Sequence, residues 1–157
     1  MNSETLNSDK IAELLSQIPD PEIPAINIAE LGVLRGVEEK DGMIIITITP
    51  TYSGCPALHA IEDEIRRTLL EKNINNFKIV TSLFPAWSTD WMTPDTRKKL
   101  SDYGIAPPEK KQKTENTICP FCKSDNTKLT SWFGSTACKA LHYCNNCHQP
   151  FEEFKCI

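Results

Sequence analysis

The chain has 157 residues, 39% of them apolar and 24% charged, which is the composition of a globular protein rather than a disordered one. The polar start MNSETLNSDK and the lack of any apolar run near the roughly 20 residues of a membrane span predict a cytoplasmic protein without a signal peptide or anchor. Residues 1–107 hold 16 acidic against 10 basic side chains, and residues 108–157 hold 5 against 7. The acidic first part disfavours nucleic acid as a partner, because phosphate binding depends on clustered Lys and Arg.

The first elements are a short helix and a hairpin. Ser8 is a suitable N-cap, and apolar residues follow at the spacing of one buried helical face: Ile11, Leu14, Leu15 and Ile18. The prolines of the stretch that follows, from Pro19 to Pro24, end the helix and keep the chain extended. The runs LGVLRGVEE and GMIIITITP, rich in β-branched residues and separated by Lys-Asp-Gly, then predict a β-hairpin.

A second helix and a third strand follow the hairpin. Residues 56–72 place Leu58, Ile61, Ile65 and Leu69 on one helical face, and residues 77–84 read as a strand. Thr93 and Pro94 begin a further helix that Gly104 ends. We therefore expect an α/β (α+β) domain over residues 1–107, with a small three-stranded sheet on which helices pack.

Residues 108–117 have no large apolar side chain and are predicted to form an exposed linker to a second domain, residues 118–157. That domain holds six of the seven cysteines. Four of them form two C-x-x-C pairs with 21 residues between the pairs: Cys119, Cys122, Cys144 and Cys147. Because two such turns can direct four thiolates at one ion, the pattern predicts a zinc ribbon with a structural Zn²⁺.

The ligand set has alternatives. Cys138 or Cys156 could replace one of the four cysteines, and His142 and His148 are near enough in sequence to coordinate. We rank the paired cysteines first because their turn geometry is local, and we expect Cys138 and Cys156 to be buried packing thiols.

The stretch YSGCPAL places Cys55 directly before a predicted helix. If Pro56 is the first helical residue, Cys55 occupies the N-cap. The backbone N–H groups of Ala57 and Leu58, together with the helix dipole, then favour a thiolate, which could act as a nucleophile or ligate iron or an iron–sulfur cluster. The alternative is a half-buried cysteine that only packs.

Three further residues are candidates for the same site. Asp20 and Glu22 lie in the proline-rich loop, and Thr51 lies just before Cys55. Their ordinary roles are turn stabilisation for Asp20 and capping or strand packing for Thr51. We expect all three to approach Cys55.

The motifs together carry a resemblance that extends over almost the whole chain: DPEIP, ELGVLRGV, TPTYSGCPA, PAWSTDWM, YGIAPP, CPFC and GSTACKALHYCNNCHQPFEEFKCI. In this order they resemble the PaaD family of the bacterial phenylacetyl-CoA epoxidase system. Residues 1–107 alone resemble the wider family of small iron–sulfur assembly factors that includes the SufT-like proteins.

The resemblance implies a zinc-binding second domain and an accessory role in phenylacetate catabolism. The partners would be the oxygenase and reductase components of the epoxidase, and Cys55 would handle iron or a transient iron–sulfur cluster. The residues agree that the chain is not itself the oxygenase, because no Glu stands three residues before His59, His142 or His148. A G-x-G-x-x-G fingerprint is also missing.

Competing functions remain at this point. One thiolate is too few for a stable cluster, so delivery would require a homodimer or a client complex that adds ligands. The main alternative is a docking protein with a purely structural zinc site. Thiol–disulfide exchange through a C-x-x-C pair ranks below both.

Overall fold

The computed structural model describes residues 7–52, 54–109 and 116–155. The chain divides into two compact units, Met1–Trp87 and Ser88–Ile157. The first unit contains two helices and three strands, in the order α1 (Ser8–Leu15), β1 (Leu34–Lys40), β2 (Met43–Ile48), α2 (Ala57–Glu71) and β3 (Phe77–Thr81).

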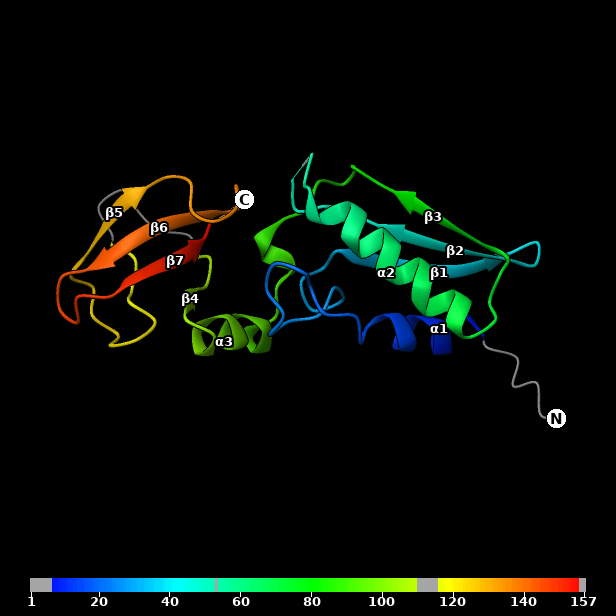
Figure 1. The fold of residues 1–157 in the computed structure, drawn as a ribbon, viewed down its shortest axis with the longest axis horizontal. Helices are drawn as coiled ribbons and strands as arrows, with labels where there is room; N and C mark the ends of the chain where they lie inside the picture. Colours follow the sequence, from blue (N-terminus) through cyan, green and yellow to red (C-terminus); the bar gives the residue numbers. More distant parts are fainter. Residues whose placement is uncertain (1–6, 53, 110–115, 156–157) are drawn as a thin grey trace. The chain divides into compact units, whose positions relative to one another are not determined.

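The three strands form one sheet in the order β1-β2-β3 (Figure 1). Strands β1 and β2 pair antiparallel across a tight turn, in which Asp41 and Gly42 both have positive φ, 51° and 76°. This backbone matches the right-handed twist of a two-stranded ribbon. Strand β3 pairs parallel to β2, so α2 is the crossover that connects them.

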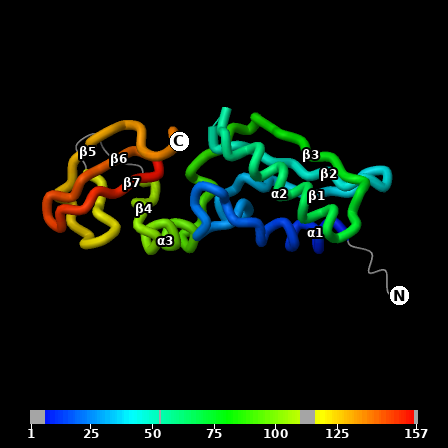
Figure 2. Tube along the Cα trace, viewed as in Figure 1, coloured from blue at the N-terminus to red at the C-terminus, as the bar shows by residue number. Residues whose placement is uncertain are grey.

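Helix α2 lies across the sheet (Figures 1 and 2), and its apolar face is buried at Ile61, Ile65 and Leu69. Alternate residues of β2 are buried in the same way, at Ile44, Ile46 and Ile48. A period of 3.6 in the helix thus meets a period of 2 in the strand. The predicted class, an α+β domain with a three-stranded sheet and helices packed on it, is confirmed. As a consequence, the loop that enters α2 lies at the carboxyl ends of the parallel strands.

Three local expectations are corrected. The side chain of Asn7, not that of Ser8, caps α1, accepting a hydrogen bond from Lys10 N at 3.0 Å. Strand β3 ends at Thr81, and the following Leu83 and Phe84 are exposed. Helix α2 begins at Ala57 with Pro56 as its N-cap residue, so Cys55 lies one position before the cap.

The second unit contains η1 (Thr89–Trp91), α3 (Pro94–Asp102), β4 (Ile105–Ala106), β5 (Thr127–Ser131), β6 (Lys139–Cys144) and β7 (Pro150–Phe154). Its sheet has the order β4-β7-β6-β5, with β4 parallel to β7 and the other pairs antiparallel. The predicted start of α3 is confirmed, since Thr93 Oγ1 accepts from Thr96 N at 3.2 Å. Gly104 follows the helix with φ of 90°.

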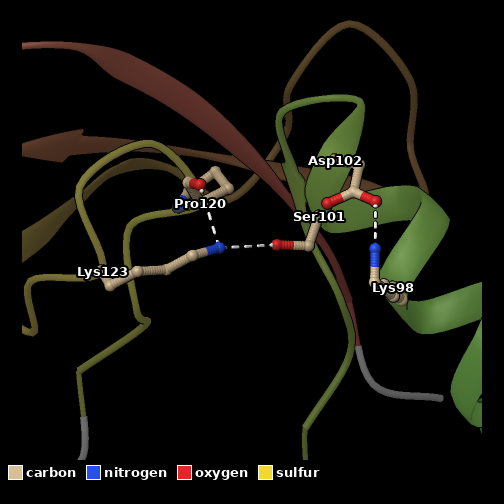
Figure 3. A network of polar contacts seen from close by, with 5 residues as sticks. All are labelled: Lys98, Ser101, Asp102, Pro120 and Lys123. Atoms are coloured by element: carbon tan, nitrogen blue, oxygen red, sulfur yellow. Dashed lines mark hydrogen bonds and ion pairs between the residues drawn. The ribbon is translucent and has the colours of Figure 1, made fainter.

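Helix α3 contacts the first C-x-x-C turn (Figure 3). The ammonium group of Lys123 donates to Ser101 Oγ at 3.0 Å and to the Pro120 carbonyl at 3.1 Å. A Cβ atom at Gly104 would lie 3.1 Å from the Phe121 ring, so this close approach favours glycine. The helix therefore supports the turn that carries two candidate ligands.

The division of the chain falls before the boundary expected at residue 107, because β4 adds a strand to the second sheet. The ends of the predicted linker are also folded. Pro108 is buried and its carbonyl accepts from Arg97, and Thr117 is buried and donates to Glu153 Oε2 at 2.9 Å. Residues 110–115 of the predicted linker lie outside the described residues. Within the described ranges, no helix is long and apolar enough to cross a bilayer.

Candidate functional site

Four cysteine sulfurs converge in the second unit, all within 4.8 Å of one another: those of Cys119, Cys122, Cys144 and Cys147. Cys119 Sγ lies 3.7 Å from Cys147 Sγ, and Cys122 Sγ lies 3.6 Å from Cys144 Sγ. A tetrahedral Zn²⁺ with bonds of about 2.3 Å separates its sulfurs by about 3.8 Å, so these distances fit such an ion. The two predicted C-x-x-C pairs come together as the spacing indicates.

The thiols differ in acidity. The side-chain amide of Asn146 donates to Cys122 Sγ at 3.5 Å, and with the backbone N–H of Ser124 it lowers the pKa of Cys122 to about 6. Desolvation, followed by the neighbouring thiols, raises the pKa of Cys147 to about 12. Four thiolates therefore need a bound cation to coexist. Sequence reasoning missed Asn146, whose signal is its position inside the second C-x-x-C pair.

The alternative ligands have other partners. Cys138 is buried, with its sulfur 3.0 Å from Thr136 Oγ1, which agrees with a packing role. The His142 ring stacks on Phe151, and its Nε2 lies 2.8 Å from a carboxylate oxygen of Glu153. His148 Nδ1 lies 3.2 Å from the Tyr143 hydroxyl, and Cys156 lies outside the described residues.

The second candidate site surrounds Cys55, the one cysteine of residues 1–87. Cys55 is 9% exposed and lies in the loop between β2 and α2. Its neighbour Gly54 has φ of 82° and no atom within 4 Å of the place where a side chain would begin. The thiol is thus largely covered but lies beside open space.

The expected thiolate at Cys55 is corrected, because the pKa of this thiol is raised. Burial is the largest cause, and the negative charge of Glu22 adds to it. The N–H groups of Ala57 and Leu58 and the Thr51 hydroxyl act in the opposite direction, as hydrogen-bond donors that favour the thiolate. The helix terminus does supply donors to the sulfur, but desolvation outweighs them.

The predicted neighbours of Cys55 are placed by the proline-rich loop. The Asp20 side chain is 4% exposed, and its Oδ1 accepts from the backbone N–H groups of Glu22 and Ile23, both at 2.9 Å. Asp20 therefore fixes the turn that carries Glu22, whereas Glu22 and Thr51 act directly on the thiol. The structure brings Cys55, Glu22 and Thr51 together and gives Asp20 a supporting position.

Comparison with known proteins identifies both units. The family model of the PaaD zinc beta ribbon domain matches residues 105–155. A component of 1,2-phenylacetyl-CoA epoxidase from Escherichia coli K12 is 47% identical over 152 residues, which cover 94% of this chain and 92% of that protein. The chain belongs to the PaaD family. The resemblance seen in the sequence motifs is thereby confirmed.

The first unit of this PaaD family member has relatives of its own. The family model named iron–sulfur cluster assembly protein matches residues 8–73. An Fe-S protein maturation auxiliary factor of Porphyromonas gingivalis is 32% identical over 103 residues, or 64% of this chain and 97% of that protein. The crystal structure of a DUF59 domain of unknown function from Bacillus anthracis matches with a TM-score of 0.54 and 25% identity, covering 59% of this chain and 90% of that one.

Proposed function

We propose that this chain is a cytoplasmic accessory protein of phenylacetyl-CoA epoxidase in phenylacetate degradation. In this proposal it does not perform the epoxidation. It binds iron or an iron–sulfur cluster at Cys55 and passes this cargo to the oxygenase or the reductase of the system. The observation that carries the proposal is a thiol with backbone donors and a carboxylate around it, in the unit that matches the iron–sulfur assembly family.

The surroundings of Cys55 suit a ligand that is loaded and released. At neutral pH the raised pKa keeps the thiol protonated, so cargo binding breaks the S–H bond, forms an S–Fe bond and releases the proton to solvent. The Glu22 charge that disfavours a bare thiolate would favour a bound cation. The thiol is therefore quiet when empty and receptive to a metal.

Cys55 alone does not complete a binding site. Within the described ranges, the four-cysteine group of the ribbon is the one set of three or more metal-ligating side chains close enough to share an ion, and it lacks Cys55. Clusters are normally held by four ligands. The missing ligands would come from the client or from a second protomer in a homodimer.

We propose a separate, structural role for Cys119, Cys122, Cys144 and Cys147, which would hold one Zn²⁺. The sulfur separations of 3.6 and 3.7 Å support this ion, as does the match to a zinc ribbon family. The bound ion would supply no chemistry beyond folding energy, on the order of 10–16 kcal/mol of apparent binding free energy.

A docking protein with an inert Cys55 is the second candidate, and the burial of the thiol favours it. Deletion of the protein, followed by iron and sulfide analysis of the purified oxygenase and reductase, separates the two. Delivery predicts that one of these components emerges without its metal while this chain does not co-purify in stoichiometric amounts. Docking predicts full metal content and a stable stoichiometric complex.

A further inference from the structure

The loop between β5 and β6 exposes two large aromatic side chains (Figure 1). Trp132 is 59% exposed and Phe133 is 65% exposed, although both lie in a folded part of the second unit. We define residues 131–135 as the aromatic loop. Exposed aromatic residues of this kind are common at the centres of protein interfaces and add little to the stability of an isolated chain.

The aromatic loop is held in one conformation by several polar contacts. Ser131 Oγ bonds both the carbonyl and the N–H of Phe133, at 2.8 and 3.3 Å. The Glu152 carboxylate accepts from Ser135 N at 2.8 Å and from Ser135 Oγ at 2.9 Å. The two rings are thus presented in advance, which lowers the entropy lost when a partner binds.

A positive charge accompanies the rings. The Lys155 ammonium donates to the Trp132 carbonyl at 3.0 Å and lies 4.7 Å from the Trp132 ring centroid and 4.6 Å from that of Phe133. Among the described residues no carboxylate lies within 4.0 Å of this ammonium. The charge is therefore available to a carboxylate of a partner.

We propose that the aromatic loop docks an acidic protein surface, one that offers an apolar pocket edged by carboxylates. Residues 108–157 hold 7 basic against 5 acidic side chains, so the wider charge of the ribbon favours the same kind of partner. A symmetric contact with a second copy would bring two Lys155 side chains together and is disfavoured. The proposal rests on the proposed function in one respect, namely that the partner is the client protein.

The test measures binding of the full chain, loaded with Zn²⁺, to purified oxygenase and reductase components of the epoxidase by biolayer interferometry. Trp132→Ala should weaken binding to one component by at least about tenfold. Lys155→Gln should weaken it and reduce its dependence on salt between about 50 and about 300 mM NaCl. The matched controls Leu70→Ala, which removes another exposed apolar side chain, and Lys128→Gln, whose ammonium lies over Tyr143, should bind like the wild type.

A second variant guards against misfolding. A Cβ atom at Gly134 would lie 2.3 Å from Glu152 Oε2, so Gly134→Ala should displace the loop while keeping both rings, and it should also weaken binding. Unchanged binding in Trp132→Ala and Gly134→Ala overturns the proposal. So does a change of oligomeric state in Trp132→Ala, or binding of a single-stranded oligonucleotide that Trp132→Ala abolishes. Cys55→Ala should bind the client normally, so a failure of delivery and a failure of docking are distinguishable.

Discussion

The Glu22 carboxylate lies near enough to Cys55 for its charge to raise the pKa of the thiol, although the whole β1–β2 hairpin separates the two residues in the chain. The proline-rich loop and the start of α2 thus form one electrostatic unit. Its acidity is set by a balance between burial and Glu22 on one side and the donors at Thr51, Ala57 and Leu58 on the other.

The alkylation rate of Cys55 by iodoacetamide should follow this balance. Since only the thiolate reacts, the rate should rise with pH to a midpoint above that of a free cysteine. Glu22→Gln removes a negative charge and should lower the midpoint, whereas Thr51→Val removes a donor and should raise it. Mass spectrometry of the peptide that contains Cys55 measures the rate, and one common midpoint for all three proteins would contradict the electrostatic account.

Asp20 should act on Cys55 through the loop. Asp20→Ala removes the acceptor of two backbone N–H groups and should cost about 1–3 kcal/mol in free energy of unfolding. It should also change the alkylation profile of Cys55, because Glu22 loses its fixed position. Asp20→Asn retains an oxygen acceptor and should largely preserve both. Equal destabilisation in the two variants, measured by urea denaturation, would show that the acceptor is not what matters.

The sequence predicts the elements of this unit better than its chemistry. Periodicity and turn residues are local, so α2, the hairpin and the donors at Ala57 and Leu58 can be read from the chain. The sign of the pKa shift at Cys55 cannot, because it depends on burial and on the charge of Glu22, which the fold brings from another loop.

The ribbon should bind one zinc ion per chain. Cys119→Ser and Cys144→Ser should lose the ion in non-denaturing mass spectrometry, and a strong chelator should unfold residues 105–155 while leaving the first unit folded. Cys138→Ser is the matched control, since its sulfur contacts Thr136 and lies outside the four-cysteine group. Zinc loss from the control alone would reject the proposed ligand set.

The four candidate ligands are predictable because each C-x-x-C turn has a local geometry that sequence spacing reveals. Strand β4 is not predictable, because Ile105 and Ala106 are too few to show a period and are strand-like only through their pairing with β7. That pairing also explains why the second unit starts earlier than composition indicates.

The central claim concerns Cys55 as the carrier of the cargo, and metal content of the client tests it most directly. Cells that lack this protein are complemented with the wild-type chain, with Cys55→Ala, or with the matched variant Cys138→Ala, which also removes a buried thiol. The iron and sulfide of the purified oxygenase and reductase are then measured. The account predicts that one component is depleted with Cys55→Ala and full with Cys138→Ala, and full metal content with Cys55→Ala would contradict it.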